Sequence, residues 1–281
     1  MSASDAERRI NRLLDKAEKN QVFPQVSADL HKAIQEGNAT TYKLEKLLFT
    51  DTKLGLAIVT RASQLQKQNW STMRDLPAAI ESVGLARLNS MVMAIEVAKL
   101  TISGRESLRK YWAHALRTAC LARAIAAQTM TVPEEDAFVG GIVHDIGVIF
   151  MRAVGSSSYP KTLRLCGVTL VGLSLLERDR YGYDHGEIGQ MMLGRMGGSK
   201  ILLDGVYTHH EEKPSALGAV LHVADNIDVF STLGMSQEMV ANSAVDLAVA
   251  QQIGLKESNY LELIKQAHAD ANAIMLLVSQ L

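Results

Sequence analysis

The chain has 281 residues, enough for one large or two medium domains, because a single core stops growing at roughly 250 to 300 residues. Hydrophobic residues make up 47% and aromatic residues 5%, which predicts a globular protein with an aliphatic core. The 29 basic and 30 acidic residues give a formal net charge of −1, so no overall field attracts nucleic acid or anionic lipid.

The first part of the chain has apolar residues three and four positions apart, and only five prolines occur in the whole sequence. This period predicts helices, and no alternating pattern typical of strands extends beyond a few residues. Helices are expected within residues 28–37, 40–51, 52–64 and 75–100. Thr40 or Thr41 and Asp75 are candidate N-caps, and Pro77 fits a first turn. We expect these helices to form a bundle spanning residues 1–105.

The second part of the chain continues the helical pattern. Helices are expected within residues 111–128, 132–154, 184–198, 199–213 and 215–234. The helix that starts at Pro133 is expected to run without interruption, and Asp184 is expected to cap the next one, which Gly197 and Gly198 close. A polar loop at 235–243 leads to further helices. The pattern therefore predicts a helical core over residues 106–235 and C-terminal helices over 236–281.

The N-terminal twenty residues are charged where a secretory signal would need an apolar run. The longest apolar stretch is shorter than the roughly 18 to 20 residues that span a bilayer. Both features predict a cytoplasmic protein that does not cross a membrane. Cys120 and Cys166 lie far apart without C-x-x-C spacing, which indicates two buried thiols rather than a disulfide or a thiolate metal site.

Histidines are concentrated in the predicted core. Six of the eight fall between positions 114 and 222, namely His114, His144, His185, His209, His210 and His222. Histidine is the commonest metal ligand, so this clustering indicates a metal site. His31 and His268 lie outside the cluster and are interpreted as ordinary core or surface residues.

The adjacent pair His144-Asp145 lies in a run of apolar residues, where an ionised carboxylate is costly unless it is paired or coordinated. A divalent cation with mixed nitrogen and oxygen ligands would satisfy it. The candidate ligands are His114, His144, Asp145 and Asp225. Neighbouring residues on a helix point about 100° apart, so the pair converges only on a metal placed over the helix. Gly140, Gly141 and Gly147 would let other helices approach this place closely.

These four residues match, in order and context, the H…HD…D signature of the HD superfamily of metal-dependent phosphohydrolases. The chain as a whole resembles the HDOD family, a bacterial signalling branch of that superfamily. The resemblance covers roughly residues 20–230 and rests on "LEKLLFTDTKLGLAIVTRASQ", "YWAHALRTACLARAIA", "GGIVHDIG", "YGYDHGEIGQMMLGRM" and "VYTHH". It implies an all-α fold with an HD-domain-like helical core (106–235) behind the N-terminal helical part of the HDOD domain (1–105).

The chain also resembles the HD-GYP cyclic-dinucleotide phosphodiesterases, whose two-metal core adds further histidines to the tetrad. His185, His209 and His210 stand at the matching places. Two metals about 3.5 to 4 Å apart could activate a water and clamp a phosphodiester. Asp145 would be the bridging ligand, because a carboxylate has two oxygens. The resemblance thus implies one or two divalent ions, with iron, manganese, zinc and nickel all compatible with such ligands.

The chain departs from the catalytic relatives at three places. Val148 stands where they carry the lysine of HD-x-G-K, so the cation that would meet a substrate phosphate is missing. The D-G-x-G-Y-P loop of the HD-GYP group does not follow His209-His210. Lys110 replaces a glutamate that binds a further metal in some of those enzymes. The sequence supports metal binding more strongly than turnover.

Several of these residues have an alternative interpretation. His185 could bond main-chain groups at a helix start, and His209-His210 could form a solvated helix end beside Glu211 and Glu212. His222 shares a helix face with Asp225, so it could either support a metal ligand or be an ordinary core histidine.

Two functions compete at this point. The first is a regulatory signalling module that binds a partner protein or a nucleotide, with weak or absent catalysis. The second is a metal-dependent phosphohydrolase acting on a nucleotide or cyclic dinucleotide, in which Asp145 is the catalytic residue and helps to orient a metal-bound hydroxide. Nucleic-acid binding is disfavoured by the neutral charge and scarce aromatics, and the oligomeric state is left open.

Overall fold

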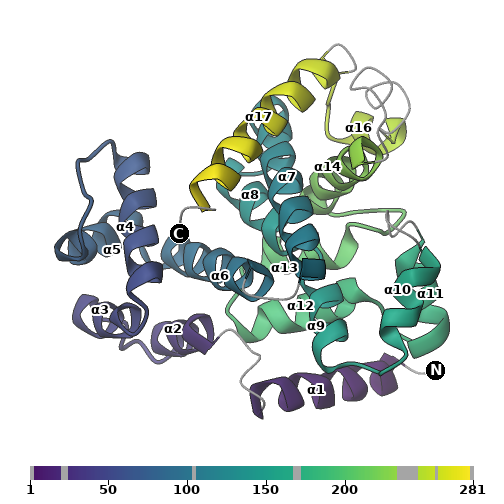
Figure 1. Ribbon diagram of the computed structural model, residues 1–281, viewed down its shortest axis with the longest axis horizontal. Helices are drawn as coiled ribbons and strands as arrows, with labels where there is room; N and C mark the ends of the chain where they lie inside the picture. Colours follow the sequence, from purple (N-terminus) through teal and green to yellow (C-terminus); the bar gives the residue numbers. More distant parts are fainter. Residues whose placement is uncertain are drawn as a thin grey trace.

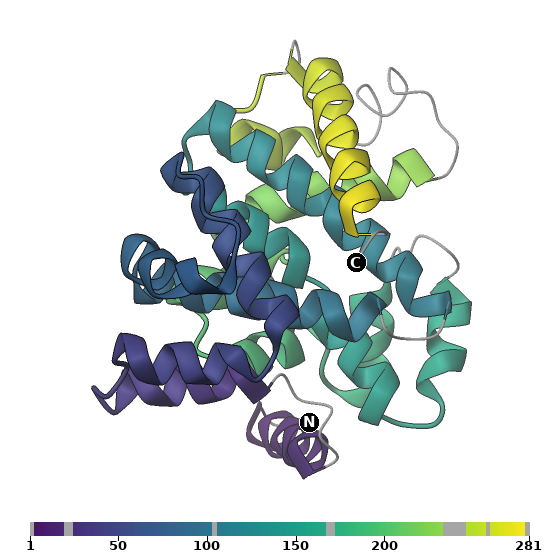
Figure 2. The same cartoon turned by 60° about the vertical axis from the view of Figure 1, so that its left-hand side comes forward.

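A computed structural model of the chain describes residues 3–19, 25–102, 106–166, 172–232, 246–256 and 259–278. Throughout these residues the regular structure is helical, with no strand, so the predicted all-α class is confirmed. Figures 1 and 2 show a small group of N-terminal helices at one side of a larger helical body. The predicted loop at 235–243 lies outside the described residues.

The N-terminal bundle packs around a hydrophobic cluster of its own. Its helices are α2 (Gln25–Gln35), α3 (Thr41–Phe49), α4 (Thr52–Gln66), the short 3₁₀ helix η1 (Met73–Asp75), α5 (Leu76–Val83) and α6 (Leu85–Ile102). The Thr40 hydroxyl accepts a hydrogen bond from the Lys43 main chain, which confirms Thr40 as an N-cap. The predicted helix over 75–100 is wrong at Gly84, whose φ of +77° separates α5 from α6.

Asp75 directly precedes α5, yet its carboxylate does not cap that helix. It accepts hydrogen bonds from the main-chain N–H groups of Ser71 and Thr72, at 3.0 and 2.9 Å. These bonds hold the pKa of Asp75 below its ordinary value. The predicted cap therefore stabilises the turn that enters η1.

The helical core is built around a long helix, α7 (Glu106–Thr129), which packs against α8, α14 and α17. Its other helices are α8 (Glu134–Val143), α9 (Ile146–Val154), α10 (Tyr159–Cys166), α11 (Leu173–Tyr181), α12 (His185–Arg195), α13 (Lys200–Thr208), α14 (Ala216–Thr232), α16 (Leu247–Gln252) and α17 (Tyr260–Val278). Figures 1 and 2 agree that α17 lies along α7.

The first helix, α1 (Ala3–Lys19), packs against α9 and α12 of the core. Its apolar residues Ile10, Leu14 and Ala17 are buried in the core cluster rather than in that of the bundle. Figure 1 shows α1 running beneath α9 and α12. The domain boundaries at 105 and 235 stay a prediction.

The bundle holds the C-terminal end of α12. The Asn89 amide of α6 donates to the carbonyls of Gly197 and Met196, at 2.8 and 3.3 Å. Arg61 of α4 pairs with Glu135 of α8 at 2.6 Å. These contacts tie the C-terminal end of α12 and the N-terminal end of α8 to the bundle.

The helix predicted over 132–154 is interrupted at His144-Asp145, between the end of α8 at Val143 and the start of α9 at Ile146. The His144 ring nitrogen Nδ1 donates to the Gly141 carbonyl at 2.9 Å, a carbonyl that an uninterrupted helix uses for its own ladder. Asp145 takes φ −99° and ψ +17°, outside the helical range. His144 and Asp145 are therefore not neighbours on one intact helix, and their side chains are not bound to point about 100° apart.

Residues Glu134–Val154 are also the one described stretch that is long and apolar enough to span a membrane by composition. In the fold, 72% of that window is buried inside the protein, and the turn at His144-Asp145 divides it. The stretch is a core element of the helical body.

Two glycines let helices approach at this turn. A Cβ on Gly147 would lie 2.0 Å from the His185 carbonyl oxygen, and one on Gly141 would lie 2.3 Å from Ala119 Cα. The main chains of α9 and α12, and of α8 and α7, thus touch directly. Gly140 is less constrained, since its Cβ would meet only leucine side chains at 3.3 Å.

We expect Gly147→Ala to destabilise the fold by about 1 to 3 kcal/mol or more, because a main-chain oxygen cannot give way cheaply. Gly194→Ala on α12 is the matched control, since its Cβ would meet only Leu203 at 3.5 Å. Urea unfolding of the two variants measures the difference. Equal midpoints for both would contradict this account of the helix contact.

Candidate metal centre

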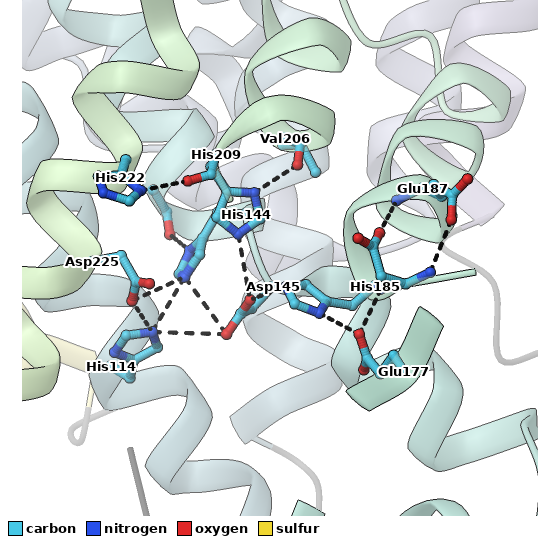
Figure 3. Close-up of polar contacts among 12 residues, drawn as sticks. His114, His144, Asp145, Glu177, His185, Glu187, Val206, His209, His222 and Asp225 are labelled. Atoms are coloured by element: carbon cyan, nitrogen blue, oxygen red, sulfur yellow. Dashed lines mark hydrogen bonds and ion pairs between the residues drawn. The ribbon is translucent and has the colours of Figure 1, made fainter. Parts of the chain in front are cut away.

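The carboxylate of Asp145 lies at the centre of the histidine cluster, and its two oxygens face different rings (Figure 3). Oδ2 lies 3.8 Å from Nε2 of His114 and 3.6 Å from Nε2 of His144. Oδ1 lies 3.5 Å from Nε2 of His185 and 3.9 Å from Nε2 of His209. The site therefore divides into two groups of donors that share one carboxylate.

The first group joins α7, the turn between α8 and α9, and α14. It consists of His114, His144, Asp225 and the Oδ2 atom of Asp145. Oδ1 of Asp225 lies 3.2 Å from Nε2 of His114 and 3.7 Å from Nε2 of His144. The two Nε2 atoms are themselves 3.2 Å apart. Four donor atoms from three helical segments thus surround one point.

The first group holds a proton in the metal-free chain. Burial alone would lower the pKa of His114, but hydrogen bonds to Asp225 and Asp228 outweigh it and hold this pKa well above its ordinary value. Burial alone would raise the pKa of Asp225, but hydrogen bonds to His114 and His144 outweigh it and hold this pKa well below its ordinary value. A positive charge is thus favoured between these carboxylates, at the place where a cation would bind.

The second group is made of residues at the ends of α12 and α13. It consists of His185, His209, His210 and the Oδ1 atom of Asp145, whose donor atoms all lie within 4.8 Å of one another. His185 is the first residue of α12, and His209 is the C-terminal cap of α13. His185 and His209 are buried, whereas His210 is exposed. The second group is therefore open to solvent on the side of His210.

Two nitrogens of the second group lack a partner. Nε2 of His185 and Nε2 of His209 are buried and make no hydrogen bond within the described part of the chain. A buried polar atom is normally hydrogen-bonded, so two such atoms beside one carboxylate are suited to bind a cation. Burial also holds the pKa of His209 well below its ordinary value, which keeps that ring neutral, as a metal ligand must be.

In each of the four proposed ligand histidines that are not exposed, Nδ1 contacts a hydrogen-bond acceptor. His114 contacts Asp228 at 2.7 Å, His144 the Gly141 carbonyl at 2.9 Å, His185 Glu177 at 2.6 Å and His209 the Val206 carbonyl at 2.7 Å. Carboxylates and carbonyls accept hydrogen bonds, so Nδ1 donates and Nε2 is the atom left to face Asp145. This is the arrangement that protein partners give to metal-binding histidines.

The donor set fits a divalent cation in each group. Two donors bound to one cation at about 2.1 Å lie about 3.0 to 3.4 Å apart in octahedral or tetrahedral geometry. The Asp145 oxygens and the surrounding nitrogens are 3.5 to 3.9 Å apart, so a small contraction would bring them to that spacing. Imidazole and carboxylate together suit zinc, iron, manganese and nickel.

The sequence profile of the HDOD domain matches residues 21–212, which is more than half of the chain. The chain belongs to the HDOD family. The match includes six of the seven predicted metal ligands and ends before Asp225.

Solved structures share the fold of this HDOD protein. A protein from Shewanella amazonensis, provisionally named a phosphohydrolase, is 20% identical, with 91% of this chain and 97% of that chain covered and a TM-score of 0.57. An HDOD domain protein of unknown function from Geobacter sulfurreducens is 19% identical, with 89% and 90% covered and a TM-score of 0.61.

A third structure, from Marinobacter aquaeolei and provisionally named a signal transduction protein, is 15% identical. It covers 92% of this chain and 58% of that chain, with a TM-score of 0.61. No protein with a curated description matches the chain. At these identities, the three structures establish a common fold.

Within this HDOD fold, the seven residues predicted as metal ligands all lie in the two groups around Asp145. Asp184 is an N-cap, as predicted, and it forms a capping box with Glu187. His185 is the first residue after the cap, but its ring faces Asp145 on one side and Glu177 on the other. The alternative of a purely main-chain role for His185 therefore does not describe its contacts.

The helix predicted over 199–213 ends earlier, at Thr208, so His209 and His210 lie in the turn that follows α13. Among the described residues Glu211 pairs with Arg178, which also contacts Asp184 at 2.6 Å. Glu211 thus anchors the turn to Arg178 of α11, which also holds Asp184 at the start of α12. For Glu211, the pairing with a histidine considered as an alternative is replaced by pairing with an arginine.

Two buried carboxylates support the site and were not predicted. Asp228 is held by Nε and Nη2 of Arg117, the latter at 3.0 Å, in addition to His114. Glu177 accepts from the Tyr159 hydroxyl and, at 2.9 Å, from the main-chain N–H of His185. Asp228 follows Asp225 by three residues on α14, a spacing that could have indicated it. Glu177 carries no local signal, since only the fold brings α11 to His185.

Three other residues complete the comparison with the sequence. Val148 is fully buried in the core cluster, so α9 places no cation at that position. Lys110 is exposed on α7. His222 does not face Asp145 but contacts the His209 main chain instead.

Proposed function

We propose that this HDOD protein is a signal-transduction protein whose helical core holds a divalent metal centre on Asp145, with weak or absent catalysis. The proposed ligands are His114, His144, Asp145 and Asp225 for the first ion, and Asp145, His185, His209 and His210 for the second. The identity of each ion is left as iron, manganese, zinc or nickel.

One observation carries the metal proposal. Four imidazoles from separate segments of the chain have Nδ1 held by an acceptor and Nε2 directed at the two oxygens of a single carboxylate. Two of these Nε2 atoms are buried without a hydrogen-bond partner in the described part of the chain. An arrangement that leaves such atoms unpaired is costly in the absence of a ligand, and a cation supplies one.

The regulatory role is favoured by what surrounds the centre. Ions bound there would neutralise the charge of a phosphate group and polarise its bonds. Phosphoryl transfer also uses a side-chain cation on the phosphate, and the position where related enzymes carry lysine is the buried Val148. The proposal includes a nucleotide ligand or a partner protein in signalling, in the cytoplasm.

A metal-dependent phosphohydrolase acting on a nucleotide or cyclic dinucleotide is the second candidate. The division of the Asp145 oxygens between two groups favours it, since one carboxylate shared between two ions is the arrangement that clamps a phosphodiester. In that case Asp145 is the catalytic residue, and its contribution is to hold both positions at a fixed spacing.

A single set of measurements separates the two candidates. The full chain is purified, its iron, manganese, zinc and nickel content is measured, and hydrolysis of phosphomonoesters and cyclic dinucleotides is assayed beside Asp145→Ala. Metal without hydrolysis supports the regulatory proposal. Hydrolysis that Asp145→Ala abolishes establishes the enzyme instead. A chain that takes up no metal under supplementation with each ion refutes both.

A further inference from the structure

His222 lies on α14, one turn before Asp225. Its Nδ1 atom is 2.8 Å from the main-chain oxygen of His209 (Figure 3). A carbonyl oxygen only accepts, so Nδ1 of His222 carries the proton and donates it. On the other side of the ring, Nε2 is 3.0 Å from the amide nitrogen of Asn226. The orientation of the His222 ring is therefore fixed from both sides.

The carbonyl that His222 contacts lies between two proposed ligands, at the C-terminal end of α13. His209 caps the C-terminus of α13, where the last carbonyls of a helix have no partner within the helix. That carbonyl belongs to the rigid peptide unit joining His209 to His210. A hydrogen bond to this carbonyl fixes the plane of the peptide that joins the side chains of His209 and His210. His222 thus acts on two proposed ligands without touching the ion.

Helix α14 also contributes to the first group. Asp225 follows His222 by three residues, so both project from one face of α14. Asp225 faces His114 and His144, whereas His222 faces the turn after α13. The same helix therefore sets the position of the second group relative to the first.

We propose that His222 is a positioning residue for the second ion, acting through the peptide between His209 and His210. The inference rests on the proposed metal centre. Loss of its N–H donor lets that peptide turn and moves two ligands of the second ion, while the ligands of the first ion keep their own supports at Asp228 and Gly141. The second site is therefore selectively weakened.

The test compares His222→Leu with His222→Asn in the full chain. Leucine fills the space without a donor, whereas the asparagine side-chain amide can place an N–H group close to the position of Nδ1. Mn²⁺ is titrated into each metal-free protein and followed by electron paramagnetic resonance, which counts bound ions. The same spectra detect the magnetic coupling of two ions about 3.5 to 4 Å apart. Circular dichroism checks that both variants are folded.

The wild type is expected to bind two Mn²⁺ ions with a coupled spectrum. His222→Leu is expected to bind the first ion unchanged and the second about 10 to 100 times more weakly, the usual effect of removing a partner behind a ligand. His222→Asn is expected to restore most of the second affinity. A general loss of stability would weaken both ions together and would not be rescued by asparagine.

Three results would overturn the inference, and they separate its failure from that of the metal centre. If the wild type binds two ions and His222→Leu binds both with unchanged affinity, the positioning role is refuted and the metal centre stands. If leucine and asparagine weaken the second ion equally, the N–H donor is not the cause. If the wild type binds fewer than two ions, the two-ion centre fails, and the inference fails with it.

Discussion

Asp145→Ala is expected to abolish metal binding at both positions, whereas Asp225→Ala is expected to abolish it at the first position alone. The reason is geometric, because Asp145 gives Oδ2 to one group and Oδ1 to the other. The ion pairs that Asp225 makes among the described ligand residues are with His114 and His144 of the first group. Each lost affinity should fall by more than about 100-fold, beyond the effect of altering a partner behind a ligand.

Isothermal titration with Mn²⁺ or Zn²⁺, together with the metal content of the purified variants, gives the number of ions. The comparison is matched, since each variant removes one aspartate carboxylate of the same cluster. Two patterns would contradict the shared-carboxylate geometry. One is an Asp145→Ala protein that still binds an ion tightly, and the other is an Asp225→Ala protein that loses both.

The metal-free protein is expected to lose stability as the pH rises from about 7 to 10. Burial alone would lower the pKa of His185, but the Glu177 carboxylate outweighs it and raises this pKa to about 10. A group whose pKa is raised on folding adds stability fully below its unfolded value of about 6.5, and that stability is lost as the pH passes the folded value. The free energy of unfolding should fall by a few kcal/mol over this pH range.

A bound cation should replace that proton, so the loaded protein should show a smaller fall over the same range. Metal uptake at pH 7 should also release protons, which titrations in buffers of different ionisation enthalpy measure. Glu177→Gln is the control, because its amide oxygen can still accept from His185 Nδ1 but carries no charge. A metal-free protein whose stability is flat from pH 7 to 10, or identical in Glu177→Gln, would contradict the paired charge.

The seven proposed ligands could be found from the sequence because the resemblance to HD proteins fixes their order along the chain. Of the ligand histidines, His185 alone stands at a helix end that the sequence marked, directly after the Asp184 cap. His114 lies within α7, and the helix ends beside His144 and His209 were not predicted. The caps Asp184 and Thr40 could also be predicted, because each side chain accepts from a main-chain N–H group only three residues away.

The interruption at His144-Asp145 could not be predicted from periodicity. The apolar pattern continues on both sides of it, and the contacts made there are tertiary or side-chain ones: His144 donates to the Gly141 carbonyl, and α12 approaches Gly147. This interruption matters more than any other departure, because it lets His144 and Asp145 face the same centre. The pair therefore needs no metal placed over an intact helix.

The residues that hydrogen-bond the proposed ligands could not be predicted from the sequence, for a different reason. Glu177 and Arg117 act through partners that are 8 and 111 positions away along the chain, and such contacts are set by how α11 and α14 pack. His222 was recognised as sharing a face with Asp225, yet its target, a main-chain carbonyl on another helix, has no sequence signature. The sequence pattern identifies the metal-donor residues, whereas the packing of the helices determines which residues hydrogen-bond to them.

We propose that divalent ions bind on both sides of the Asp145 carboxylate. Crystals of the protein grown with Mn²⁺ and measured at a wavelength where manganese scatters anomalously would locate these ions. We expect two anomalous peaks, one among His114, His144 and Asp225 and the other among His185, His209 and His210. An anomalous map without a peak beside Asp145, repeated with iron, zinc and nickel, would contradict it.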